Sequence, residues 1–354
     1  ELNAATSREH TVVYARVPDA KLETAVSVMA PMVFSPSFED LDSEREVVLE
    51  EIAMYEDSPG ELVHDLFSEA VFGDHALGRP VIGTAEVIST VSRRALAAYH
   101  RAAYAEGNVV IAAAGNIEHE RLVELVRRRG SASNGSAAKP PIRKPLVKAP
   151  PPSLRFGRKD TEQYNVCLGA PGIARSDRRR FAASLLDSIL GGSASSRLFQ
   201  EIREKRGMAY AVYSFGSQYT DTGLLGVYLG TREENLGPCL EIVAEQIADI
   251  GAGNLREREL ERAKENLKGR IMLGMESTSN RMSRLGKSQI TDAELLSFAR
   301  TIAEIEAVDA EGVCELAALL LAPEQLSIAA IGPSEERFLE AAGRVYPGLV
   351  RAAA

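Results

Sequence analysis

The sequence predicts an α+β fold with two homologous domains, each built from an antiparallel sheet with helices packed on one face. Three observations support this prediction. Strand-like segments come in adjacent pairs, with helical segments grouped after them. A proline-rich stretch separates the two halves of the chain. A segment of the first half also recurs in the second half without a gap, which is typical of a duplicated domain.

Composition excludes several classes of protein. A chain of 354 residues with 45% hydrophobic and 26% charged residues is long enough for two soluble domains. The net charge of -9 argues against a general nucleic-acid binder. No apolar run reaches the length of a membrane span. We therefore expect neither a nucleic-acid nor a membrane partner.

The cysteines and histidines give no complete site. Cys167, Cys239 and Cys314 are odd in number, widely spaced and embedded in apolar patterns. They are typical of core residues in a reducing compartment, which predicts a cytoplasmic protein. The five histidines make no HxxEH or HxxH pair, so the sequence alone does not complete a metal site with three ligands.

The first half of the chain is predicted to be mainly helical. Residues 1–17 alternate between apolar and polar side chains, as in a strand or one limb of a hairpin. Apolar residues then recur at helical spacing, and Ser58-Pro59-Gly60 separates two of the helices. Helices are predicted over 18–33, 38–56, 61–72, 84–90, 92–103 and 118–129, and a buried strand over 108–115.

A change in composition marks the domain linker. Residues 131–153 are rich in Ser, Gly, Ala and Pro, which cannot pack a core and favour extended chain. The linker's basic residues, Lys139, Arg143, Lys144 and Lys148, are interpreted as part of a solvated spacer. The predicted domains are therefore 1–130 and 154–354. The second is expected to contain strands over 161–172, 208–219 and 223–230 and helices over 178–190, 195–205, 240–250 and 256–275.

The predicted helix 38–56 contains an anomaly. Glu44 and Glu51 fall on the stripe of Leu41, Val48 and Tyr55, among the apolar residues of the helical wheel. An unpaired carboxylate buried there would cost several kcal/mol, so we expect a buried cation, a metal ion or a water-filled cleft beside it. Ion pairs with Arg or Lys of another element are the alternative. The two Cα atoms are roughly 10 Å apart on a helix, so one carboxylate would be a ligand and the other a neighbouring or substrate-facing group.

An internal repeat shows where the two halves of the chain differ. The segment Ile88–Ile117 aligns with Ile305–Ser334 at a constant shift of 217. A shift of 219 aligns the anomalous helix with the segment after Leu260, where Ala263 replaces Glu44 and Arg270 replaces Glu51. Loss of both carboxylates predicts a functional site in the first copy and a supporting role for the second. The same shift places the expected start of the first copy roughly 65 residues before Glu1.

Four motifs carry a resemblance to a known family: ELNAATSREHTVVYARV, SEREVVLEEIAMYEDSP, HALGRPVIGT and GGSASSRLFQEIREKRGMAYAVYS. The chain resembles the insulinase-like zinc peptidases, the family of pitrilysin and the mitochondrial processing peptidases, and most closely their short bacterial members. The resemblance extends from Glu1 to about Ser334. It implies a zinc-dependent endopeptidase that cleaves peptides or unfolded segments inside a closed chamber, formed with an identical or a homologous partner subunit. A non-catalytic structural or substrate-holding subunit is the alternative.

The resemblance also implies roles for particular residues. An inverted HxxEH motif supplies two histidine ligands and a general base in the family, and Glu51 matches the third zinc ligand. Glu44 matches a second carboxylate close to the metal. The HxxEH motif itself is absent from these 354 residues and is expected to precede Glu1. Either a preceding segment carries the motif, or the natural protein differs from its relatives.

The resemblance further implies substrate contacts from both halves. Asn3, Ala4 and Thr6 match a strand that binds the substrate backbone as an added strand. A plain edge strand is the alternative. Arg203 and Tyr210 match an Arg and a Tyr that reach the substrate carbonyl or its tetrahedral intermediate. A surface Arg and a half-buried Tyr would be the alternative interpretation.

Overall fold

The computed structural model describes residues 1–130 and 143–353, which form two compact units. Residues 131–142 of the predicted linker 131–153, which include Lys139, lie outside the described residues. Both units are discontinuous in sequence. The first comprises Glu1–Ala53, Pro80–Lys144 and Met272–Leu295, and the second comprises Met54–Arg79, Pro145–Ile271 and Leu296–Ala354.

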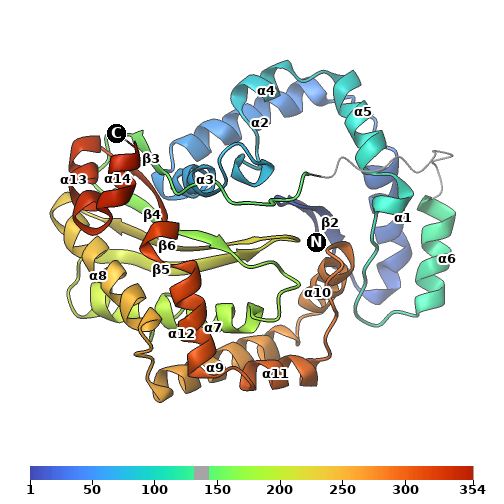
Figure 1. The fold of residues 1–354 in the computed structure, drawn as a ribbon. Coiled ribbons are helices and arrows are strands. Elements are labelled where there is room, and N and C mark those ends of the chain that lie inside the picture. Colours follow the sequence, from blue (N-terminus) through green and yellow to red (C-terminus); the bar gives the residue numbers. More distant parts are fainter. Residues whose placement is uncertain (131–142, 354) are drawn as a thin grey trace. The chain divides into compact units, whose positions relative to one another are not determined.

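A five-stranded sheet forms the centre of the second unit (Figure 1). The strand order is β3-β7-β4-β6-β5, so consecutive strands in space are not consecutive in sequence. Pairing is antiparallel except between β3 and β7, which are parallel, so the predicted antiparallel sheet is in fact mixed. The strands are β3 Leu154–Arg158, β4 Tyr164–Gly172, β5 Ala209–Gln218, β6 Gly223–Thr231 and β7 Ser327–Gly332.

Side chains of the central strands alternate between two apolar layers. Val166 and Leu168 of β4 belong to a core shared with helices on one face, whereas Cys167 between them belongs to the core on the other face. The first face is covered by α7, α8, α12 and α13. The helices of this part of the chain are α7 Arg180–Leu190, α8 Glu233–Gly251, α9 Glu257–Gly274, α11 Phe298–Glu306, α12 Ala310–Leu320, α13 Glu335–Val345 and α14 Pro347–Ala353.

The other face of the sheet is covered by α3, Pro59–Phe72. This helix buries Val63, Phe67 and Val71 almost completely against β4 and β7. The predicted α+β class is confirmed, but helices cover both faces of this sheet and not one, because both faces of its central strands are apolar. Residues 54–79, expected within 1–130, thus pack with the second unit. The duplication boundary between 130 and 154 stays a prediction about the sequence.

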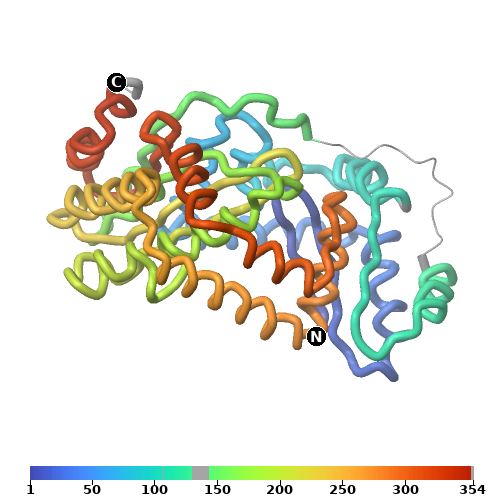
Figure 2. The backbone as a smooth tube through the Cα atoms, turned by 60° about the horizontal axis from the view of Figure 1, so that its bottom comes forward, coloured from blue at the N-terminus to red at the C-terminus, as the bar shows by residue number. Residues whose placement is uncertain are grey.

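The first unit contains a hairpin and a set of helices. Strands β1, Leu2–Thr6, and β2, Thr11–Ala15, pair antiparallel, as the alternation in residues 1–17 predicts. Figure 2 follows the backbone from this dark-blue hairpin to the orange α10, which joins the same unit from the second half of the sequence. The helices are α1 Leu22–Phe34, α2 Leu41–Glu56, whose last turn is assigned to the second unit, α4 Ala85–Thr90, α5 Arg93–Ala103, α6 His119–Gly130 and α10 Thr278–Ile290.

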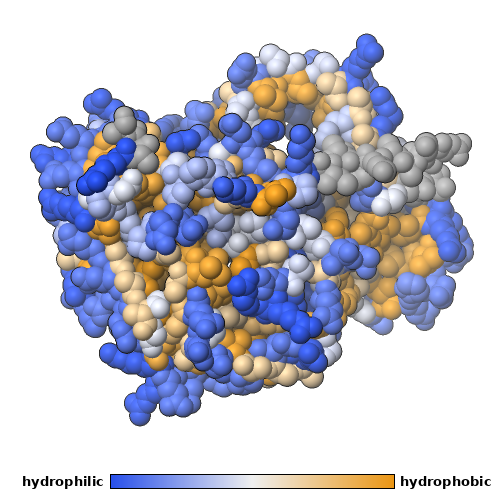
Figure 3. All heavy atoms as spheres, viewed as in Figure 1, coloured by the Kyte–Doolittle hydropathy of each residue, from blue (hydrophilic) through white to orange (hydrophobic). Residues whose placement is uncertain are grey.

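Apolar side chains remain at the surface of this unit. Figure 3 shows apolar surface over α1, where Val28 and Met32 are 45% and 48% exposed. The predicted strand 108–115 is also wrong, because residues 109–114 form no strand and Ile111 is 50% exposed. Its repeat counterpart β7 is fully buried between β3 and β4. Within the described part of the first unit the hairpin is the only sheet, so residues 109–114 have no strand to pair with.

The duplication is visible in the bounds of the elements. The shift of 217 carries α5 onto α12 at both ends, and carries the 3-10 turn Glu106–Asn108 onto Pro323–Gln325. Equivalent residues cap the two helices, since the Ser92 hydroxyl accepts from Ala95 N–H and the Asp309 carboxylate from Gly312 N–H. The two copies therefore start these helices by the same local hydrogen bond.

Two predictions from composition can be compared with the structure. Cys167, Cys239 and Cys314 are free and buried, as their apolar surroundings predict. Among the helices that the structure describes, none combines the length and the apolar character needed to span a bilayer.

His64 fixes α3 to the sheet through both ring nitrogens. Its Nε2 lies 3.1 Å from the hydroxyl of Tyr213, and its Nδ1 lies 3.7 Å from the sulfur of Cys167. The ring also stacks on Tyr228. A neutral imidazole satisfies both contacts, because Nδ1 accepts from the thiol and Nε2–H donates to the phenol. Burial lowers the pKa of His64 below 6.5, and the negative charge of the neighbouring Asp65 opposes this shift.

We predict that acid destabilises this unit through His64. The unfolded chain binds a proton near pH 6.5, whereas the folded chain binds it at a lower pH, so stability is complete above 6.5 and falls as pH decreases towards the folded pKa. His64→Gln should remove about 1 kcal/mol of this pH dependence, measured by urea unfolding between pH 5 and 8. His119→Gln, at an exposed position, is the control. An unchanged pH dependence in His64→Gln would contradict the prediction.

Candidate functional site

Helix α2 packs through a narrower stripe than its sequence predicts. Ile52 is buried, and Leu41, Val48 and Tyr55 are half-buried. The Arg45 side chain also lies on the packed side, where it donates hydrogen bonds to the carbonyl oxygens of Ile88 and Val91. The packed stripe is therefore rotated towards Arg45 and away from the centre of the apolar arc.

This rotation leaves Glu44 and Glu51 exposed. The predicted inward position of both carboxylates is wrong, because they flank an apolar strip of α2 that is itself uncovered, with Val47 59% and Met54 72% exposed. No hydrogen bond or ion pair to either carboxylate is formed by the described residues. Residues 44 and 51 therefore need no compensating cation, and both are open to solvent and to ligands.

The donor set can be tested for its fit to a zinc ion. Structural and catalytic zinc sites use three or four protein ligands. Among the residues that the structure describes, no group of three or more His, Cys, Asp and Glu side chains could hold a metal. Glu51 offers one carboxylate, so residues 1–130 and 143–353 do not by themselves fit a zinc ion.

The second copy shows what replaces the two carboxylates. Ala263, at the position of Glu44, is buried in the core of the second unit. Arg270, at the position of Glu51, acts through its charge on Asp187 of α7. Burial raises the pKa of Asp187, while a hydrogen bond from Ser214 and the charge of Arg270 oppose the shift. In this copy the guanidinium of Arg270 on α9 therefore interacts with the carboxylate of Asp187 on α7.

Strand β1 presents a free edge. Glu1 and Arg16 exchange backbone hydrogen bonds, and Ser7 N–H donates to His10, so the alternating pairs include Asn3 and Ala5. Ala4 and Thr6 consequently direct their backbone groups to the open edge. All five residues of β1 are exposed.

The side chains at this edge already make local contacts. The Ala4 N–H donates to the side-chain oxygen of Asn3 at 2.8 Å. The Thr6 and Thr11 hydroxyls lie 3.2 Å apart across the hairpin. Asn3, Ala4 and Thr6 thus lie on an edge strand, which fits both the expected added-strand binding and the alternative of a plain edge strand.

The structure brings Arg203 and Tyr210 together within the second unit. The Arg203 guanidinium carbon lies 4.5 Å from the centre of the Tyr210 ring and 4.8 Å from that of Phe199. Such stacking is attractive and holds the guanidinium plane against the ring. Tyr210 is 80% exposed, so its hydroxyl is open to solvent and the expected half-buried alternative does not apply.

The turn that carries Arg203 is π-helical, Phe199–Glu204. The predicted helix 195–205 contains this segment, but nothing in its sequence indicates the wider turn. Arg197, which is nearly buried and bonded to Asp249 and Glu259, was also not predicted as a site residue. An arginine directly before the buried Leu198 is the signal that could have identified it.

Comparison with protein families agrees with these features. Residues 1–85 match the model described as Insulinase (Peptidase family M16), and residues 90–267 match that of the Peptidase M16 inactive domain. An uncharacterised zinc protease of Streptomyces coelicolor is 41% identical, with 95% of this chain and 75% of the relative covered. An uncharacterised zinc protease of Bacillus subtilis is 38% identical, with 94% and 81% covered.

Solved structures support the same fold. A protease from Helicobacter pylori superposes with a TM-score of 0.83 at 19% identity, with 94% of this chain and 82% of that chain covered. A peptidase M16 inactive domain from Pseudomonas fluorescens gives a TM-score of 0.80 at 22% identity, with 94% and 81% covered. At such identities the likeness concerns the fold alone. The two family models and the sequence relatives together establish that the chain belongs to the insulinase family of peptidases, family M16.

Proposed function

We propose that this chain carries the greater part of a zinc-dependent endopeptidase that cleaves peptides or unfolded segments. The observation that carries the proposal is the restriction of Glu44 and Glu51 to the first copy. The second copy has Ala263 and Arg270 at these positions, so the helix itself does not require the two carboxylates. Both carboxylates are exposed, on one side of α2, and neither has a side-chain partner among the described residues, which leaves them open to a ligand.

The β1 edge supports the binding of an extended peptide. Ala4 and Thr6 direct their backbone N–H and C=O groups outward, and these can form a ladder with a third strand. Asn3 would release the Ala4 N–H when the peptide arrives. Backbone pairing reads no side chain of the peptide, which suits an enzyme that acts on many unfolded segments.

Arg203 and Tyr210 are proposed to contact the substrate carbonyl. The guanidinium is always charged and donates several hydrogen bonds, and the exposed Tyr210 hydroxyl donates another. Donors of this kind stabilise the negative charge that develops on the carbonyl oxygen during attack on a peptide bond. The stack on the Tyr210 and Phe199 rings holds the guanidinium in one orientation, which reduces the reorganisation needed in the reaction.

Glu51 is proposed as one zinc ligand, and Glu44 as a carboxylate that orients the groups around it. Since the described residues do not complete a zinc site, the remaining ligands belong to the inverted HxxEH motif expected in the natural protein. Cleavage inside a chamber formed with an identical or homologous subunit, in the cytoplasm, completes the proposal. The further ligands and the chamber rest on the family resemblance, and the cytoplasmic location rests on the free, buried cysteines.

A non-catalytic subunit of the same family is the second candidate. It is favoured by the lack of a three-ligand group in the part of the chain that the structure describes. Zinc content and cleavage of a quenched peptide by protein expressed from the natural initiation codon distinguish the two candidates. Stoichiometric zinc with cleavage supports the peptidase, and the lack of both supports the non-catalytic subunit.

The two carboxylates should respond differently to amidation in the protein expressed from its natural start. Glu51→Gln removes a charged ligand and should lower zinc occupancy sharply. Glu44→Gln should retain most of the metal and lower kcat by about 10-fold or more, as expected for a residue that orients a ligand. Metal analysis after gel filtration and peptide hydrolysis measure both effects.

The control for these variants is Glu46→Gln, an exposed carboxylate on the opposite side of α2. It should retain metal and activity. Equal loss of zinc in the Glu44 and Glu51 variants would contradict the different roles assigned to them.

Removing the proposed carbonyl donors should lower kcat and leave the affinity for peptide nearly unchanged. Tyr210→Phe keeps the ring that supports Arg203 and loses the hydroxyl, and Arg203→Met loses the charge. A loss of about 100-fold in kcat is expected for each, the usual effect of a single donor to the oxyanion. Steady-state peptide hydrolysis measures it, and an unchanged kcat in both variants would rule out the assignment.

A further inference from the structure

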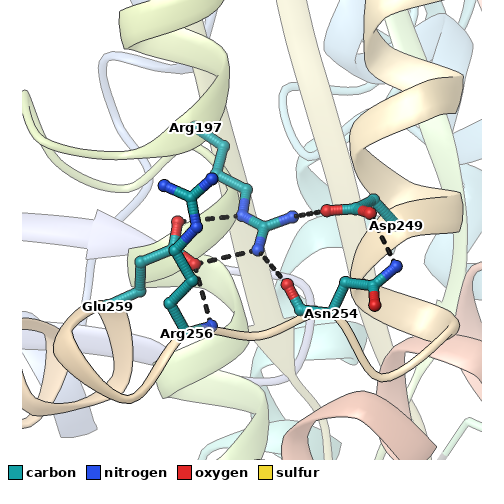
Figure 4. A network of polar contacts seen from close by, with 5 residues as sticks. All are labelled: Arg197, Asp249, Asn254, Arg256 and Glu259. Carbon is teal, nitrogen blue, oxygen red and sulfur yellow. Dashed lines mark hydrogen bonds and ion pairs between the residues drawn. The ribbon is translucent and has the colours of Figure 1, made fainter.

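Arg197 is a nearly buried cation at the start of the turn that leads to Arg203. Its side chain is 9% exposed. Nε and Nη2 bind the two carboxylate oxygens of Glu259 at 3.1 and 2.9 Å. Nη1 donates to Asp249 at 2.7 Å, and Nη2 also donates to the carbonyl oxygen of Asn254 at 2.7 Å. Figure 4 shows the guanidinium enclosed on three sides by these partners.

The partners of Arg197 come from α8, from α9 and from the loop between them. The Asn254 amide donates to Asp249 at 2.8 Å, and the Arg256 N–H donates to Glu259 at 3.1 Å, so the acceptors are themselves held in place (Figure 4). Burial disfavours the charge of Arg197, but the bonds to Glu259 and Asp249 outweigh it and raise the pKa of the guanidinium. The network therefore fixes the position of the chain at residue 197, where the segment leading to Arg203 begins.

That chain adopts an uncommon conformation. Residues 197 and 198 are α-helical, and Phe199–Glu204 are π-helical. The widened turn is closed by Lys205 N–H donating to Gln200 at 3.0 Å, one residue farther back than in an α-helix. Turns of this kind are rare, and they are frequent at functional sites.

The far end of the π-helical turn is held independently of Arg197. Met208 N–H donates to Ile202, and the Thr231 hydroxyl donates to the Met208 carbonyl at 2.7 Å. Gly207, with a φ of 62°, adopts the left-handed conformation that reverses the chain into β5. Because the end of the turn at Met208 is fixed on the sheet, the conformation of the turn depends on the position of its start. Arg197 fixes that start.

We propose that Arg197 is a positioning residue for Arg203: by anchoring the start of the π-helical turn to Asp249 and Glu259, it places the Arg203 guanidinium on the Tyr210 ring. The guanidinium fork is needed for this, because a lysine in its place can bind one carboxylate but cannot span Glu259, Asp249 and the Asn254 carbonyl together. The role of this arrangement in catalysis rests on the proposed function. The placement of Arg203 by Arg197 does not depend on it.

The first experiment measures the position of Arg203 without reference to activity. In the 354-residue chain the Nε–Hε resonance of Arg203, identified by its loss in Arg203→Lys, reports the ring current of the aromatic rings beneath it. Tyr210→Leu gives the value without the Tyr210 ring. Arg197→Lys should move the resonance most of the way to that value with an unchanged far-ultraviolet circular dichroism spectrum.

The controls keep this experiment decisive. Arg300→Lys, in an exposed ion pair with Glu304, should leave the resonance in place. Asp249→Asn removes the charge of one partner of Arg197, keeps the bidentate pair with Glu259, and should give a smaller shift in the same direction. If Arg197→Lys does not fold, the Asp249→Asn shift decides. An unshifted resonance in the folded variants overturns the proposal.

The second experiment uses peptide hydrolysis by protein expressed from its natural start. Arg197→Lys should lower kcat by about 10-fold with KM within about twofold, and should cause no further loss when Arg203 is already Met. An additional loss in the Arg203→Met background would indicate a general structural role and contradict the proposal. Full activity of the Arg203 and Tyr210 variants would instead remove the proposed function, while the resonance of Arg203 still decides the positioning role.

Discussion

The second unit depends on burial of its sheet from both sides. Along β4, β6 and β7 neighbouring side chains enter different cores, so each central strand contributes to two apolar layers. One layer is closed by helices that follow the strands in sequence. The other layer is closed by α3, Pro59–Phe72, which lies far before the first strand of the sheet, β3, in sequence. Without α3, Cys167, Ala329 and Ile331 would lie at an open surface, at a cost of roughly 25 cal/mol for each Å² of apolar area exposed.

The predictions from sequence succeeded where local chemistry decides the outcome. The start of the predicted helix 92–103 is fixed by one side-chain bond of Ser92, and the extended conformation within residues 1–17 follows from alternation. The position of a strand in a sheet depends on partners far away in the chain. The segment 108–115 has nearly the same apolar pattern as β7 and still forms no strand, because β7 lies between two paired neighbours and residues 109–114 do not.

The environment of the candidate site was not predictable from the sequence. The helical wheel singled out Glu44 and Glu51, and the comparison of the two copies restricted them to the first copy. The helical wheel placed them inward, because it cannot show that Arg45 occupies the packed side of α2. The stack of Arg203 on Tyr210 depends on a π-helical turn, and no periodicity in the sequence indicates where a helix widens by one residue.

On the free edge of β1, the Ala4 N–H already donates a hydrogen bond to the side-chain oxygen of Asn3. An uncovered strand edge invites pairing with any other exposed strand, including that of a second molecule, and the amide oxygen of Asn3 competes with such unwanted partners. An incoming chain gains one backbone bond there only by breaking an existing one. An added strand would therefore gain less at Ala4 than at an edge position whose N–H has no local acceptor.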